Sequence, residues 1–164
     1  DLVGRLMIVD ALPFYTLTIN PAATSETAVP HATAMRDWLL SQSAEQFVAF
    51  QNTSIARLAR TEAVRPALVA AGINSDRKTV ADAVYELMVT DLRPELGRIR
   101  APIEIVYAYD PLFGIPAASV DMMYRQAYAA ASDIHFTRID DSFHFVMLDQ
   151  PERFSSAVAS FLNQ

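Results

Sequence analysis

The chain has 164 residues, a net charge of −6, 52% hydrophobic residues and no cysteine, which is the composition of one soluble globular domain. An acidic chain without a run of Lys or Arg presents no electrostatic footprint for nucleic acid or for an anionic membrane surface, so we expect neither as a partner. The absence of cysteine excludes a disulfide framework, an iron–sulfur cluster and a thiolate zinc site. No apolar run approaches the roughly 20 residues that a membrane span needs.

The sequence begins at Asp1 rather than Met, and no basic and then apolar leader follows. We interpret residue 1 as a processing site, a proteolytic cut or an expression boundary, with something upstream missing. We favour the cytoplasm over an exported location, although the compartment stays open because many exported proteins also lack cysteine.

The predicted elements begin with a short apolar run at residues 5–10, which is too short for a helix and indicates a buried strand. Residues 14–30 contain several Pro, Thr and Ser without a sustained period, which predicts a loop. Helical periodicity then predicts four helices at residues 33–41, 44–59, 62–71 and 76–90. Ser43 starts a capping box for the second helix, and Gly72 is the predicted end of the third.

The second half of the chain alternates between strand and helix patterns. The β-branched and aromatic residues 103–109 predict a second strand, and residues 134–139 predict a third. A helix is predicted between them at 117–131, and a last helix at 151–162, where Pro151 occupies the first turn.

This order of elements predicts an α/β fold. The strands are mostly apolar instead of alternating, which is typical of a parallel sheet covered on both faces. We therefore divide the chain into a first core strand (residues 1–14), a helical cap or lid over one end of the sheet (residues 15–97) and a C-terminal core (residues 98–164).

Polar residues follow each predicted strand, where parallel sheets bind their ligands. These residues are Asp10, Asp110 and the loop 140–144, which contains His144. A carboxylate hydrogen-bonded to the imidazole would fix its tautomer and stabilise its protonated form during acid–base catalysis. The partner that this arrangement lacks is a nucleophile.

At these segments the sequence resembles the C-terminal half of an α/β-hydrolase. Residues 101–112 (APIEIVYAYDPL) resemble the segment that carries the catalytic acid, and residues 143–154 (FHFVMLDQPERF) resemble the one that carries the catalytic His. The strand that follows the nucleophile helix in this family is similar to residues 5–13. The segment that leads from the cap back to the sheet is similar to residues 91–94. The resemblance implies that Asp110 and His144 are catalytic, with Asp10 as a possible alternative acid because some members place the acid there.

The sequence departs from this family by lacking its nucleophile elbow, Gly-x-Ser-x-Gly. The four glycines are at positions 4, 72, 97 and 114, and no two of them are four residues apart. The resemblance therefore predicts the cap and C-terminal half of a hydrolase of an ester, lactone or related carbonyl compound, inactive by itself. Whether the missing nucleophile is Ser or Asp stays open.

The remaining candidates are assigned no chemistry. Ser142 is too near His144 in sequence to act as a strand-borne nucleophile, and His31 and His135 lack metal-ligand spacing and are expected to be structural. We expect no cofactor and no metal. Apolar residues at helical spacing in residues 33–90 would favour a small apolar or amphipathic substrate if they face a pocket.

Two alternatives to a hydrolase stay open. The chain is a noncatalytic binding module, or it is a remnant without a function of its own. The resemblance supports the binding module, because in the family this first strand lies beside the strand that bears the nucleophile, and without that neighbour residues 5–10 would form an exposed apolar edge. We expect this edge to pair with an N-terminal half of the same enzyme or with a second copy, or else to make the chain poorly soluble.

Overall fold

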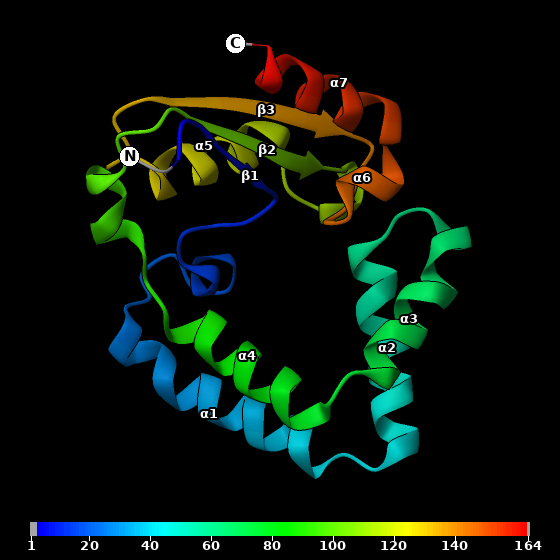
Figure 1. The fold of residues 1–164 in the computed structure, drawn as a ribbon. Helices are drawn as coiled ribbons and strands as arrows, with labels where there is room; N and C mark the ends of the chain where they lie inside the picture. Colours follow the sequence, from blue (N-terminus) through cyan, green and yellow to red (C-terminus); the bar gives the residue numbers. More distant parts are fainter. Residues whose placement is uncertain (1–2, 164) are drawn as a thin grey trace.

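The computed structural model describes residues 3–163, so the interpretation of Asp1 lies outside the described residues. Three parallel strands form one sheet in the order β1-β2-β3 (Figure 1). They are β1 (Leu6–Val9), β2 (Ile103–Tyr109) and β3 (Ile134–Asp140), at the positions that the sequence predicts. The predicted parallel α/β architecture is confirmed.

Helices cover both faces of this sheet, which explains why the central strand β2 is almost continuously apolar. On one face Ile105 and Tyr107 pack against α5 (Ala117–Ala127), which ends four residues before the predicted end of this helix. On the other face Val106 and Ala108 pack near Phe154 of α7 (Pro151–Leu162), which begins at Pro151 as predicted.

A long helical segment connects β1 to β2 (Figure 1). Within it α1 packs along α4, and α2 packs along α3. Its elements are η1 (Tyr15–Thr18), α1 (Ser25–Ser41), α2 (Ala44–Leu58), η2 (Glu62–Val64), α3 (Arg65–Asn74), α4 (Arg77–Val89) and η3 (Arg93–Arg98). Two short helices complete the described chain, η4 (Pro111–Phe113) and α6 (Val146–Asp149). Within residues 3–163 no helix combines the length and apolarity needed to cross a membrane.

The predicted loop at residues 14–30 is wrong in its second half, because α1 begins at Ser25. Thr24 and Thr27 form a reciprocal capping box that starts this helix eight residues earlier than predicted. The helix continues through Pro30, which interrupts helices because it lacks an N–H donor. Packing along α4 offsets that loss, and buried Ala28 and Ala32 lie on either side of the proline.

The predicted helix end at Gly72 is also wrong, because α3 continues to Asn74. A Cβ atom on Gly72 would overlap the carboxamide of the buried Gln51 on α2. The glycine therefore permits the close approach of two helices instead of ending one. The Ser43 capping box at the start of α2 is confirmed, with Gln46 as its second member.

The helical segment is tied to the sheet at two places. Near β1, the backbone N–H of Leu92 donates to the carbonyl oxygen of Pro13 at 2.8 Å. At the other end, the N–H of Phe145 donates to the carbonyl oxygen of Leu58 at 3.0 Å. The second contact brings the end of α2 to the loop that follows β3.

Candidate active site

The residues predicted for the site lie at the carboxyl edge of the sheet. Asp10 follows β1, Asp110 follows β2, and His144 lies four residues after the end of β3. The parallel register places Val9 beside Val106 and Tyr109 beside Asp140, so all three strands end at the same edge. This confirms the expectation that these loops are neighbours.

The imidazole of His144 contacts the carboxylate of Asp10. Nδ1 of His144 lies 3.0 Å from Oδ2 of Asp10, within hydrogen-bonding distance. The Asp10 side chain is 14% exposed and that of His144 is 45% exposed, so the pair lies at the surface with the carboxylate on its inner side. We refer to these two side chains as the Asp10–His144 pair.

Asp10 is held rigidly at the end of β1. Its Oδ1 atom accepts hydrogen bonds from the backbone N–H of Ala108 and from the phenol of Tyr124, both at 2.9 Å. Its backbone has a φ of 45°, in the left-handed region where Asp is one of the few tolerated residues besides glycine. This conformation turns the chain sharply at the strand end, and the two donors leave Oδ2 for His144.

The two side chains that bind the Asp10 carboxylate, His144 and Tyr124, both have raised pKa values. The hydrogen bond to Asp10 raises the pKa of His144 above its ordinary value, although partial burial opposes that change. Burial, with the Asp10 carboxylate beside it, raises the pKa of Tyr124 far above that of a free phenol. Tyr124 is therefore a permanent hydrogen-bond donor to Asp10 at neutral pH.

The structure does not place Asp110, our first choice of acid, in contact with His144. Asp110 is almost fully buried, and its Oδ1 accepts the backbone N–H of Leu112 at 2.8 Å. Its Oδ2 lies 2.7 Å from Nε of Arg60, with which it forms an ion pair. Arg60 follows the C-terminal end of α2, so Asp110 is bound to the helical segment. The reserve acid Asp10 contacts the imidazole instead.

Sequence reasoning did not identify Asp149, whose carboxylate stabilises the His144 loop. Its two oxygens accept the backbone N–H groups of Thr61 at 2.8 Å and of Arg60 and Phe143 at 2.9 Å. Burial alone would raise the pKa of Asp149, but these three donors outweigh burial and lower it. The only sequence signal was its position inside the segment that resembles the family's His motif.

The other polar candidates, Ser142, His135 and His31, form no hydrogen bond or ion pair with the Asp10–His144 pair in the described part of the chain. Ser142 is fully buried, and its hydroxyl donates to the carbonyl oxygen of Phe143, which fits our exclusion of it as a nucleophile. His135 is exposed on β3, where Nδ1 lies 2.7 Å from the carboxylate of Glu104, and His31 lies exposed on α1. Among residues 3–163 there is no group of three or more metal-ligating side chains.

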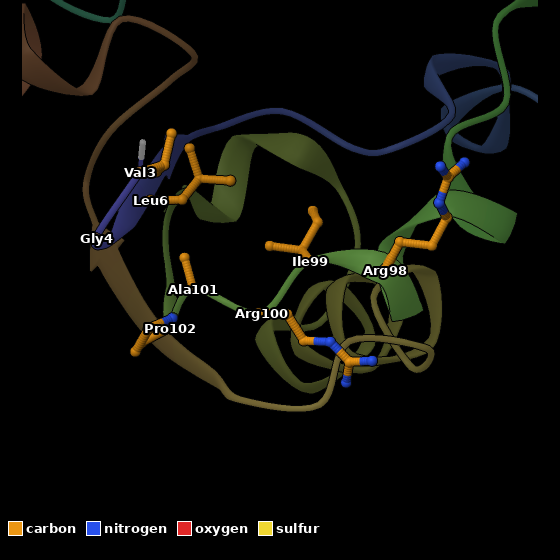
Figure 2. A pocket seen from close by; sticks show the side chains of 8 residues that line it. All are labelled: Val3, Gly4, Leu6, Arg98, Ile99, Arg100, Ala101 and Pro102. Atoms are coloured by element: carbon orange, nitrogen blue, oxygen red, sulfur yellow. The ribbon is translucent and has the colours of Figure 1, made fainter. Parts of the chain in front are cut away.

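A surface depression of about 610 Å³ lies at the opposite edge of the sheet. Figure 2 shows its lining, in which Val3, Gly4 and Leu6 of the β1 region face residues 98–102. It lies at the amino ends of β1 and β2, away from the Asp10–His144 pair. Because no carboxylate or imidazole lines it, we assign no chemistry to this depression.

Comparison with known proteins gives matches to solved structures alone. A scan of the sequence against protein-family models finds no match, and neither does a search of curated proteins. The chain is similar to the enol-lactonase from Burkholderia xenovorans, with a TM-score of 0.70 and 18% identity over 99% of this chain and 57% of the lactonase. It is similar to a hydrolase from Pseudomonas aeruginosa, with a TM-score of 0.70 and 20% identity over 98% of this chain and 56% of the hydrolase. It is also similar to an esterase from Exiguobacterium antarcticum, with a TM-score of 0.70 and 16% identity over 99% of this chain and 58% of the esterase.

These matches define the fold of the chain. It has part of the α/β-hydrolase fold, as the resemblance implied, and it spans a little over half the length of the solved structures that it matches. At identities of 16–20% the likeness establishes the fold and leaves the reaction to be argued from the site.

Proposed function

We propose that this chain is part of a hydrolase that cleaves an ester, a lactone or a related carbonyl compound. The observation that carries the proposal is the Asp10–His144 pair, with its 3.0 Å contact at the carboxyl edge of the sheet. The fold adds support, because the solved structures that share it include an enol-lactonase and an esterase. His144 is the proposed general base and acid, and Asp10 its positioning residue.

The geometry of the pair suits this role. With Nδ1 donating to Asp10, the second ring nitrogen Nε2 is left to accept the proton of a nucleophile as that nucleophile attacks the carbonyl carbon. The protonated imidazole is stabilised by the adjacent carboxylate, and it returns the proton to the leaving alcohol. A water molecule then hydrolyses the acyl intermediate by the same two proton transfers.

The nucleophile in this proposal comes from outside these 164 residues, since the sequence contains no Gly-x-Ser-x-Gly elbow. The coverage of 57% of the enol-lactonase leaves room for a further part of the fold. We propose that this part, on the same or a separate chain, pairs along β1, which lies at one edge of the sheet of described strands. All four β1 residues are apolar and only partly buried.

The substrate is proposed to be small and apolar or amphipathic. Apolar side chains lie beside the site on the loop that follows β2, where Leu112 is 76% exposed and Phe113 is 39% exposed. The ring of Phe113 lies 5.5 Å from that of Phe143, the residue before His144. Covering these side chains with an acyl group would contribute about 25 cal/mol per Å² of buried apolar area.

Hydrolysis of a short-chain aryl ester tests the proposal, with intact-mass analysis of the same preparation to detect a second chain. We expect turnover in the preparation that contains the complementary part, and a loss of several orders of magnitude in His144→Ala. His135→Ala is the matched control, because it removes an exposed imidazole from β3 without touching the pair. Measurable turnover that is equal in His144→Ala and in the unmodified protein, each with the complementary part present, would refute the assignment.

The edge position of β1 also supports a second candidate, a noncatalytic module that binds another chain by strand addition. The two proposals differ in their prediction for His144→Ala, which would leave binding through β1 unchanged. Light scattering tests the edge itself. We expect self-association or a co-purifying partner, and a monodisperse 18 kDa monomer would contradict both forms of pairing.

A further inference from the structure

Asp149 connects two segments that are more than 80 residues apart in sequence. Its Oδ1 accepts the N–H of Thr61, and its Oδ2 accepts the N–H groups of Arg60 and Phe143, at 2.8–2.9 Å. Arg60 and Thr61 follow the end of α2, whereas Phe143 directly precedes His144. We call this carboxylate with its three N–H donors the Asp149 clamp.

A further contact joins the same segments, because the N–H of Phe145 donates to the carbonyl oxygen of Leu58. The guanidinium of Arg60 is also ion-paired with Asp110, which follows β2. His144 thus lies between Phe143, whose N–H donates to Asp149, and Phe145, whose N–H donates to Leu58. Its own side chain contacts Asp10, which directly follows β1.

We infer that Asp149 is a positioning residue, which holds the loop 142–146 against the end of α2 and thereby places Nδ1 of His144 on Asp10. The inference rests on the proposed function for its bearing on catalysis, but the geometry concerns this chain alone. Through this clamp the helical segment sets the position of the imidazole. A displacement of residues 58–61 would move His144 relative to the fixed Asp10.

The chemistry of the clamp explains why a carboxylate is required there. Three N–H donors from two separate segments converge on one side chain, and a carboxylate offers two oxygens with about four acceptor positions. Hydrogen bonds to an ionised acceptor are also stronger than neutral ones. An Asn has a single acceptor oxygen, and its NH2 group would face at least one of the N–H donors, so it cannot close the clamp.

Two variants break hydrogen bonds of the Asp149 clamp, one at the acceptor and one at a donor, and a third variant is their control. Asp149→Asn removes the acceptor. Thr61→Pro removes a donor while keeping Asp149, and the φ of −71° at Thr61 suits proline. Asp141→Asn is matched in charge and lies in the same loop, and its φ of 61° is tolerated by Asn.

The measurement is the NMR titration of the His144 imidazole in the 164-residue chain, together with amide hydrogen exchange. Asp10 contacts the imidazole, and Tyr124 donates to Asp10. Asp149 accepts from the loop, Gln150 and Arg153 donate to the carbonyl oxygens of Asp141 and Asp140, and Arg60 donates its backbone N–H to Asp149. We expect the titration midpoint of His144 to fall by about half a pH unit or more in both clamp variants, as contact with Asp10 is lost. Asp141→Asn should leave the midpoint near that of the unmodified chain.

Hydrogen exchange gives a second result. The N–H of Phe145 is not bound to Asp149, yet its exchange should accelerate in both clamp variants because the two segments separate. If the His144 midpoints in both clamp variants equal that in Asp141→Asn, the inference is overturned, even if the clamp variants melt at lower temperature. The reason is that an Asp149 with a merely structural role would not move the titration of His144. If Asp149→Asn does not fold, Thr61→Pro decides by the same criterion.

These outcomes are separate from those of the proposed function. The titration needs no substrate and no nucleophile, so the clamp can be refuted while hydrolysis still depends on His144. Conversely, an unchanged turnover in His144→Ala would remove the catalytic role and leave the clamp as a property of the fold.

Discussion

Replacing Asp10 with Asn should move the proton of the neutral His144 ring from Nδ1 to Nε2, which inverts its tautomer, while leaving the backbone in place. The Asn oxygen can still accept from Ala108 and Tyr124, because both of them bind the same atom, Oδ1. The NH2 group then stands where Oδ2 faced Nδ1 of His144. Since an NH2 group donates, Nδ1 must accept, and the ring proton moves to Nε2.

The magnitude follows from this exchange of roles. An imidazole protonated at Nε2 cannot take the proton of a nucleophile, and the equivalent change in a catalytic triad lowers kcat by roughly 10⁴-fold. The stability cost should be much smaller, about 1 kcal/mol, because two of the three hydrogen bonds to the side chain are kept. Imidazole ¹⁵N chemical shifts in the 164-residue chain report the tautomer, and aryl ester turnover reports the rate.

Asp110→Asn is the control for this experiment. It weakens the ion pair with Arg60 but leaves the Asp10–His144 pair intact, so the tautomer should not change and turnover should fall by less than in Asp10→Asn. If Asp110→Asn inverts the tautomer and Asp10→Asn does not, then Asp110 is the partner of the imidazole and the site described here is wrong.

Three further predictions concern stability and the support of the site. The raised pKa of His144 adds folding stability that is fully present below pH 6.5 and is lost as the pH rises through the folded-state pKa. Because the side chain is 45% exposed, we expect this contribution to be less than about 1 kcal/mol. It should be seen as a fall in melting temperature above pH 6.5 that is absent in Asp10→Asn. Leu39→Ala, in the cluster that joins α1, α2 and α4, should cost about 2–5 kcal/mol in denaturant unfolding, whereas the exposed neighbour Leu40→Ala should stay within about 0.5 kcal/mol; equal costs would contradict the packing. Tyr124→Phe removes a buried donor to Asp10 and should lower turnover without inverting the His144 tautomer, and an inverted tautomer would show that Tyr124 does more than orient the carboxylate.

The sequence predicts the sheet well because its signals are local. The run of β2 is apolar along nearly its whole length, and its two faces are covered by α5 and α7, so the pattern and the packing agree. Pro30 is the counterexample. The local rule places proline at a helix end, but the Thr24 capping box and the packing of α1 on α4 determine the outcome.

The choice between Asp10 and Asp110 depends on long-range contacts that no local pattern contains. Both residues follow apolar strands, and the sequence favours Asp110 through resemblance alone. In the structure, Arg60 reaches Asp110 from just after a helix end, 50 residues away in sequence. Two donors bind Oδ1 of Asp10 and leave its second carboxylate oxygen for His144. Asp149 was missed for the same reason, since two of its three donors are almost 90 residues away.

The most direct test of the Asp10–His144 pair is the titration of His144 by NMR in the unmodified chain and in Asp10→Asn. A coupled pair predicts a midpoint above the ordinary value of about 6.5 for imidazole, which falls when Asp10 loses its charge. A midpoint at the ordinary value, unchanged in Asp10→Asn, would show that the two side chains are not coupled and would contradict the site.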